Sequence, residues 1–324
     1  MQQLGSGAWD QLHNMLLAVL VATSWLACAF AQNATAGYTI TRSHKRGLVW
    51  VSGDDTNYLD IWNSDKVDLN WYYDYSPYPT SGLDGDKFEY VPMMWGAGPE
   101  HEGFTDEVKG LLSGGMYIKY VLGFNEPDGC FGGGSCVSPK KAAKTWKKYI
   151  EPLKHEGVEL GAPAVIAGNI GWMQEFDKHC DGDCTIDFIP LHYYGESAGL
   201  ASWISTIKSA YPGTPLWVTE FAYANTTLAA SEQFLVESLA LLDAEPAVKR
   251  YSYFGAYRSD ESPNVGPNPA FLTKSGQLTD IGAWYLGLKG PKASLSGGVA
   301  GFAISPWWTM LAVSATVVMF MRVW

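Results

Sequence analysis

Short apolar runs alternate with polar, helix-period segments along most of the chain. Eight of these runs have the length and the β-branched and aromatic content of buried strands. They cover residues 48–51, 69–73, 88–94, 118–124, 158–163, 186–193, 216–221 and 250–255. Because strands that alternate with helices are typical of β-α units, the pattern predicts a parallel sheet.

The segments between the strands carry recognisable helix boundaries. Ser138 and Pro139 supply a cap residue and a proline at the first helical position, and Gly157 follows the helix expected over 140–155. Further helices are expected over residues 55–66, 102–112, 171–178, 200–210, 231–244 and 278–288.

Eight β-α units in a body of about 265 residues predict a single-domain (β/α)8 TIM barrel. The alternative is an open doubly wound sheet, which usually has a glycine-rich phosphate loop after its first strand. The residues that follow the first strand here, Ser52-Gly53-Asp54-Asp55, do not form such a motif. In a barrel, the carboxyl ends of the strands build the active site and the opposite face serves stability.

The first 31 residues have the pattern of a secretory signal. Residues 15–31 are apolar and end in Ala29-Phe30-Ala31, a small-x-small cleavage pattern. Residues 1–14 contain no Lys or Arg, so Met15 is an alternative start, and a buried N-terminal helix is the alternative interpretation.

The C-terminus resembles a glycosylphosphatidylinositol (GPI) anchor signal. Residues 302–324 are apolar, and the small, mostly polar stretch 294–301 precedes them. A retained transmembrane helix is the alternative, but Arg322 is the only basic residue in the tail. We expect the anchor at Ser296, so the chain divides into a signal (1–31), a catalytic body (32–296) and a removed tail (297–324).

The body is acidic and keeps the chain's formal net charge of −11, because the two removed ends contain one Asp and one Arg. This charge argues against nucleic acid as a partner, since phosphates would be repelled, and it suits a neutral substrate. We expect a monomer without a metal or cofactor. The 14 Trp and 18 Tyr residues could stack on sugars, but they could equally fill the core.

Four cysteines remain after Cys28 is removed with the signal, an even number that indicates disulfides in an exported chain. Cys130 and Cys136 follow strand four, whereas Cys180 and Cys184 precede strand six on the opposite face. The faces are about 17–20 Å apart, and disulfide Cα atoms are only about 4.4–6.8 Å apart, so local pairs are expected. A metal site is disfavoured because the spacings are not zinc-like.

The sequons at Asn33 and Asn225 are candidate glycan sites.

Two carboxylates end predicted strands, Glu126 at strand four and Glu220 at strand seven. Such a pair could hydrolyse a glycosidic bond, one residue as the acid and the other as the opposing carboxylate. The acid must be neutral, and a neighbouring carboxylate and partial burial would raise its pKa. Asn125 could hydrogen-bond a sugar hydroxyl. The alternative for either Glu alone is a salt bridge at the rim.

Several neighbouring side chains could complete the site. His192 and Tyr194 are two positions apart near the end of strand six, so both side chains could point into the opening of the barrel. Tyr194 could then hydrogen-bond Glu220. Trp217 has the opposite parity from Glu220 and is expected to face the helices. Candidate sugar-binding aromatics are Trp95, Trp50, Trp172 and Phe254, although each could instead belong to the core.

The ordered set of motifs resembles glycoside hydrolase family 128, the fungal-type β-1,3-glucanases of clan A. The resemblance rests on segments 121–128, 161–164, 192–195, 217–221 and 268–287, together with the helix after Ser138-Pro139. It implies a retaining mechanism on β-1,3-glucan, with Glu126 as acid/base and Glu220 as nucleophile. Together with the C-terminal anchor signal, this leads to the hypothesis of an endo-type β-1,3-glucan hydrolase at the cell surface or wall. The alternatives are a surface glucan-binding protein with little turnover, and a clan A hydrolase or transglycosylase acting on another β-glycan.

Overall fold

The computed structural model of the chain describes residues 40–51, 58–262 and 264–290. The predicted signal segment, Asn33, Ser296 and the apolar tail lie outside these residues. Within the described part of the chain, no helix combines the length and the apolar character needed to cross a bilayer.

In the described residues, eight strands form two sheets, and every strand pairing within these sheets is parallel. The larger sheet has the order β3-β2-β1-β8-β7-β6, and β4 pairs with β5 in the smaller one. All eight predicted strands are present, with ends that differ by a few residues. Their bounds are β1 Arg46–Val49, β2 Trp71–Tyr73, β3 Glu89–Tyr90, β4 Tyr120–Leu122, β5 Glu159–Gly161, β6 Ile189–Tyr194, β7 Leu216–Ala222 and β8 Val248–Tyr253.

Two isolated parallel bridges connect the smaller sheet to the larger one. Met93 pairs with Leu122 on one side, and Gly161 pairs with Phe188 on the other. A Cβ atom on Gly161 would lie 2.5 Å from the Phe188 ring, so glycine allows this close approach. The parallel α/β architecture predicted from the sequence is therefore confirmed.

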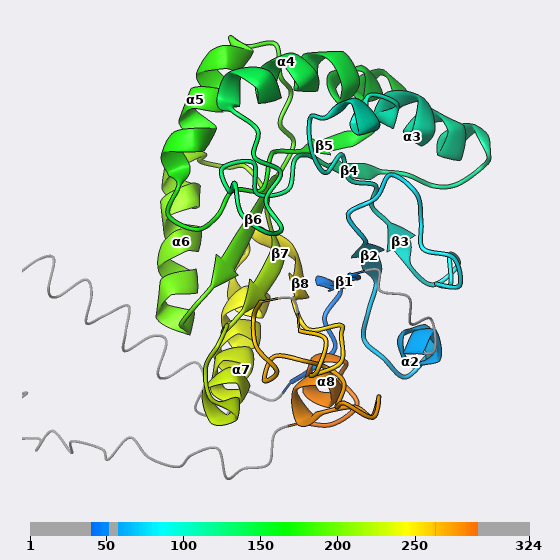
Figure 1. Cartoon of the computed structure of the whole chain (residues 1–324), viewed down its shortest axis with the longest axis vertical. Coiled ribbons are helices and arrows are strands. Elements are labelled where there is room, and N and C mark those ends of the chain that lie inside the picture. Colours follow the sequence, from blue (N-terminus) through cyan, green and yellow to red (C-terminus); the bar gives the residue numbers. More distant parts are fainter. Residues whose placement is uncertain (1–39, 52–57, 263, 291–324) are drawn as a thin grey trace, which may run out of the picture. The chain divides into compact units, whose positions relative to one another are not determined.

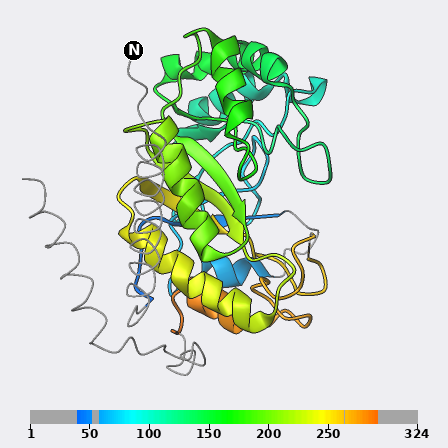
Figure 2. The ribbon, with the colours of Figure 1, turned by 90° about the vertical axis from the view of Figure 1, so that its left-hand side faces the viewer.

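Helices follow the strands in chain order and lie outside them (Figure 1). The α-helices are α2 Leu59–Asn63, α3 Phe104–Ser113, α4 Pro139–Tyr149, α5 Ile170–Cys180, α6 Ser197–Ala210, α7 Leu228–Ala244 and α8 Asp280–Tyr285, with 3₁₀ turns η2 Pro99–His101 and η3 Glu151–Glu156. The predicted cap of α4 is present, since Ser138 accepts a hydrogen bond from the Lys141 amide. Figure 2 shows α6 and α7, which pack on β6, β7 and β8.

Aromatic rings fill the space between the strands at the end opposite the candidate site. The Trp217 ring stacks on Phe188 at 4.2 Å and contacts Trp71 of β2 and Tyr120 of β4. The Arg250 guanidinium lies 4.5 Å from the Trp217 ring centroid. Trp217 thus packs against strands, and the prediction that it faces the helices is wrong.

The physical reason for this error is an irregularity in β7. Val218 pairs with Leu191 and Glu220 pairs with His192, so Thr219 is an extra residue in the ladder. A bulge of this kind reverses the alternation of side chains. Trp217 and Glu220 therefore face the same side although three positions separate them.

Both predicted disulfides are present. Cys130 and Cys136 bridge the loop after β4 with a Cα–Cα distance of 4.5 Å. Cys180 and Cys184 bridge the end of α5 with a distance of 5.4 Å. The first closes a short loop next to Glu126.

Candidate active site

Glu126 lies in the turn that follows β4, at the carboxyl end of the strand. Its amide donates a hydrogen bond to the Ala164 carbonyl at 2.9 Å, which ties the turn to the segment after β5. The Glu126 backbone has φ 39°, in the left-handed region that few residues other than glycine adopt. Such strain persists only where the surroundings fix the conformation, and it is common at functional sites.

Asn125 connects the end of β4 to the disulfide loop. Its side-chain Nδ2 donates to the Gly133 carbonyl at 2.8 Å, and its carbonyl accepts from the Ser135 amide at 3.0 Å. Its Oδ1 has no hydrogen-bond partner among the described residues. The amide donor is therefore used by the protein, whereas the side-chain oxygen is buried without a partner in the described part of the chain.

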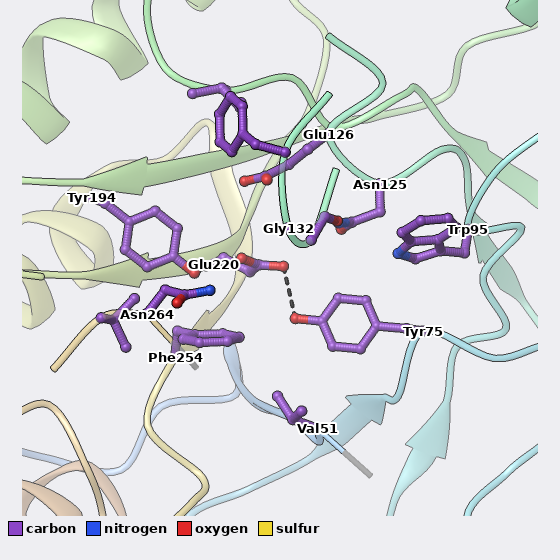
Figure 3. A pocket seen from close by; sticks show the side chains of 14 residues that line it. Val51, Tyr75, Trp95, Asn125, Glu126, Gly132, Tyr194, Glu220, Phe254 and Asn264 are labelled. Atoms are coloured by element: carbon purple, nitrogen blue, oxygen red, sulfur yellow. Dashed lines mark hydrogen bonds between the residues drawn. The ribbon is translucent and has the colours of Figure 1, made fainter. Parts of the chain in front are cut away.

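Glu220 accepts hydrogen bonds from tyrosines on two sides (Figure 3). Tyr194 of β6 donates to Oε2 at 2.6 Å, which confirms the expected bond. Tyr75, which follows β2, donates to Oε1 at 2.8 Å. The Tyr73 hydroxyl lies 3.4 Å from the same oxygen. These donors fix the orientation of the carboxylate and favour its ionised form.

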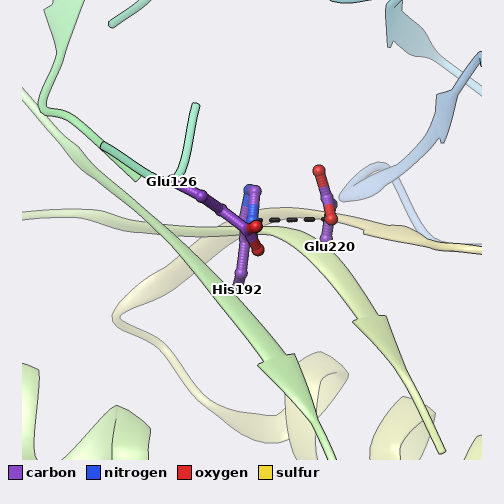
Figure 4. A group of neighbouring side chains, drawn as sticks. All are labelled: Glu126, His192 and Glu220. Carbon is purple, nitrogen blue, oxygen red and sulfur yellow. Dashed lines mark hydrogen bonds and ion pairs between the residues drawn. The ribbon is translucent and has the colours of Figure 1, made fainter. Parts of the chain in front are cut away.

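His192 lies between the two carboxylates (Figure 4). Its Nδ1 is 3.0 Å from Oε1 of Glu126 and 3.4 Å from Oε2 of Glu220. The His192 side chain is only 1% exposed. One ligating atom from each of the three residues lies within 4.8 Å of the others. The structure thus brings the two strand-end carboxylates together around one imidazole.

The same three groups are also the candidate set for a metal ion among the described residues. Both Glu220 oxygens already accept tyrosine hydroxyls, and Glu126 already contacts His192. A cation would have to displace these contacts, so the hydrogen-bond network suits proton chemistry better.

The pKa values of the three groups are coupled through His192. Burial disfavours its imidazolium, but the charges of Glu220 and Glu126 outweigh burial and raise the pKa of His192. Burial would raise the pKa of Glu126, yet the hydrogen bond and charge of His192 lower it overall. For Glu220, burial outweighs the effect of His192 and, together with the charge of Glu126, raises the pKa. The expected rise for Glu126 is therefore wrong for the free protein, because the imidazole supplies a positive partner.

A cavity of about 390 Å³ opens beside this group of residues. Trp95 and Phe254, two of the predicted sugar-binding aromatics, line it together with Asn125 and Tyr194 (Figure 3). Trp50 and Trp172 are not among its lining residues. Trp50 packs edge-on against Trp62, and Trp172 stacks on Phe176, so both behave as core aromatics.

Sequence reasoning missed Tyr75, Phe131 and Asn264, which also line the cavity. Tyr75 could have been found as a candidate, although not in its role, because it lies two residues after a predicted strand on the catalytic face. Phe131 is 69% exposed at the tip of the disulfide loop, and no periodicity indicates such a residue. Asn264 belongs to a long segment after β8 without helix or strand signals.

Comparisons with known proteins agree on one family. The family profile described as "Glycosyl hydrolase catalytic core" matches residues 47–285. Alkali-sensitive linkage protein 1 of Schizosaccharomyces pombe is 34% identical over 253 residues, or 75% of this chain. That match covers 44% of the relative, so the chain spans less than half of its length.

Solved structures give the same result. A family 128 (subgroup III) curdlan-specific exo-β-1,3-glucanase from Blastomyces gilchristii is 31% identical with a TM-score of 0.59, covering 75% of this chain and 97% of that one. A family 128 (subgroup II) endo-β-1,3-glucanase from Pseudomonas viridiflava is 27% identical with a TM-score of 0.61, covering 76% and 98%.

Replacing His192 with Gln should change the pH dependence of stability. The raised pKa of His192 gives stability that is lost as pH rises through the folded-state pKa, and the lowered pKa of Glu126 gives stability that is lost as pH falls. The pair should therefore stabilise most between about pH 4.5 and 6.5, the ordinary pKa values of the two groups. We expect the difference in unfolding free energy between wild type and His192→Gln to peak there.

Urea unfolding across pH 3–9 measures this difference, with His155→Gln at an exposed position as the control for loss of an imidazole. A difference that stays constant over the whole pH range would contradict the coupling.

Proposed function

The chain belongs to the glycosyl hydrolase catalytic core family, and we propose that it is a glycoside hydrolase that cleaves β-1,3-glucan with retention of configuration. In this proposal Glu220 is the nucleophile and Glu126 is the acid/base. The observation that carries it is the convergence of both carboxylates on His192 beside the cavity.

The spacing of the carboxylates supports retention over inversion. Retaining enzymes hold the two carboxyl groups about 5–5.5 Å apart, whereas inverting enzymes need about 6.5–9.5 Å to admit a water. One oxygen of Glu126 and one of Glu220 lie within 4.8 Å of each other. This spacing is closer to that of retaining enzymes than to that of inverting ones, and it suits direct attack by Glu220.

The hydrogen bonds separate the roles of the two residues. Glu220 accepts bonds from the hydroxyls of Tyr194 and Tyr75, which oppose the effect of burial on its pKa and stabilise the carboxylate needed for attack on the anomeric carbon. Glu126 contacts the buried imidazole of His192 instead. The proton that the leaving oxygen requires is held on this Glu126–His192 pair.

The lowered pKa of Glu126 in the free protein fits this scheme if the proton moves on binding. In the free protein the raised pKa of His192 and the lowered pKa of Glu126 both favour the ion pair, with the proton on His192. A sugar that fills the cavity excludes water, and a dry site favours the neutral acid and neutral imidazole over the ion pair. Glu126 is then protonated when the glycosidic oxygen lies beside it.

We also propose that the strands close into a (β/α)8 barrel. The bridges Met93–Leu122 and Gly161–Phe188 support closure, because they join the two sheets on both sides. In such a barrel, Glu126 follows strand four and Glu220 lies near the end of strand seven, both at the catalytic face.

The substrate and mode of action are inferred from the relatives and from the rings around the cavity. Trp95, Phe254 and the exposed Phe131 offer flat apolar faces to a glucan. We propose endo-type action, as in the Pseudomonas viridiflava enzyme, although the Blastomyces gilchristii relative is an exo-enzyme. Product sizing on laminarin separates the two modes, since an endo-enzyme releases mixed oligosaccharides and an exo-enzyme releases one small product.

Glu126→Gln and Glu220→Gln should each lower kcat on laminarin by about 10³-fold or more, because each removes a group that bond cleavage requires, the acid in one case and the nucleophile in the other. Binding of laminari-oligosaccharides should persist in both variants. Asp177→Asn, on the outer helix α5, is the control and should keep wild-type kcat. Hydrolysis that survives in either Gln variant would contradict the assigned roles.

We further propose that the protein is secreted and held at the cell surface by a GPI anchor at Ser296, with glycans at Asn33 and Asn225. The N-terminal apolar segment with its small-x-small end, the small-residue stretch before the apolar tail and the two disulfides support this. Phosphatidylinositol-specific phospholipase C should release the protein from intact cells. Protein that stays in the membrane after this treatment would point to a retained transmembrane helix.

A further inference from the structure

We propose that Asp74 is a positioning residue that holds Tyr75 against the carboxylate of Glu220. The inference rests on the proposed role of Glu220 as nucleophile. Neither Asp74 nor Tyr75 belongs to a motif that the sequence indicated, and both follow β2 at the carboxyl end of the sheet.

Tyr75 makes its contact from an unfavourable backbone conformation. Its φ is 63°, a value that is a true outlier for a bulky side chain. From this position its hydroxyl reaches Oε1 of Glu220 at 2.8 Å, and its ring packs edge-on against Tyr73. Because such strain persists only where neighbouring groups enforce it, something must fix the backbone on both sides of Tyr75.

The carboxylate of Asp74 provides that constraint. Thr80 donates its hydroxyl to Oδ2 at 2.6 Å, and the Tyr90 hydroxyl lies 3.0 Å from Oδ1. The same Tyr90 hydroxyl lies 2.6 Å from the carbonyl of Ser76, which also accepts the Met93 amide. Asp74 precedes Tyr75 and Ser76 follows it, so the network clamps the chain immediately before and after the tyrosine.

The charge of Asp74 makes this clamp strong. Asp74 is 6% exposed, and burial raises its pKa to about 6 against the opposing hydrogen bonds from Thr80 and Tyr90. At neutral pH it is therefore mainly ionised and accepts the Thr80 hydroxyl as a charge-assisted hydrogen bond, which is stronger than a neutral one. The single proton of the Tyr90 hydroxyl is shared between Asp74 Oδ1 and the Ser76 carbonyl. An uncharged side chain of the same shape would keep the packing and weaken the clamp.

A double-mutant cycle separates positioning from a merely structural role. Tyr75→Phe removes the bond to Glu220 and should lower kcat on laminarin by about 10- to 100-fold, as expected for a hydrogen bond to a charged group. Asp74→Asn should lower kcat in the same range. If Asp74 acts through Tyr75, adding Asp74→Asn to Tyr75→Phe should cost less than about 2-fold more. Independent, multiplying effects would overturn the proposal.

A second readout needs no substrate. Loss of the Tyr75 hydroxyl removes a donor to the Glu220 carboxylate, so the pKa of Glu220 should rise in Tyr75→Phe and also in Asp74→Asn. Nuclear magnetic resonance titration of the ¹³C-labelled Glu220 carboxyl measures this shift. If the wild-type protein does not cleave β-1,3-glucan, the proposed function fails, while this titration still decides the role of Asp74.

Asp177 offers a matched control. It also accepts a tyrosine hydroxyl, from Tyr211 at 2.6 Å, and burial raises its pKa, but it lies on α5 and does not line the cavity. Asp177→Asn should change neither kcat nor the Glu220 titration.

Should Asp74→Asn fail to fold, Thr80→Val and Tyr90→Phe each remove one donor and should raise the pKa of Glu220 by a smaller amount. A Glu220 titration that stays at the wild-type value in both of these variants would overturn the proposal.

Discussion

The site depends on the contact of one buried imidazole with two carboxylates. His192 Nδ1 lies 3.0 Å from Glu126 and 3.4 Å from Glu220, and the two carboxylates raise its pKa. The imidazolium form, which this shift favours, offsets both negative charges. Without it, two buried carboxylates this close would repel each other, and one would take up a proton. The imidazole thus allows both residues to sit close enough for retention and also keeps a proton next to the leaving-group side.

The fold supplies this contact through small departures from regular structure. The extra residue Thr219 in β7 turns Glu220 to the same side as Trp217, and the left-handed backbone of Glu126 points that carboxylate back toward β6. The left-handed backbone conformation of Tyr75 is a third departure from regular structure. Each of these backbone conformations is locally unfavourable and is held in place by neighbouring strands. The backbone strain therefore lies next to the proposed catalytic residues.

Much of the architecture could be predicted from the sequence, since the eight apolar runs, the α4 cap and the short cysteine spacings depend on local physics. The placement of Glu126 and Glu220 at the catalytic face and the hydrogen bond from Tyr194 to Glu220 could also be predicted, because active-site residues in a barrel lie at the carboxyl ends of the strands. The orientation of Trp217 could not be predicted, because a one-residue bulge leaves no signal in the alternation. The burial of Trp172 and the role of Tyr75 depend on contacts between distant segments, which a single sequence does not display.

The central claim is that Glu126 and Glu220 form a retaining pair. Proton nuclear magnetic resonance of the first product formed from laminari-oligosaccharides tests it most directly, because anomers are resolved before they mutarotate. Two displacements at the anomeric carbon restore the β-configuration. The account predicts that the β-anomer of the new reducing end appears first, and initial release of the α-anomer would contradict it.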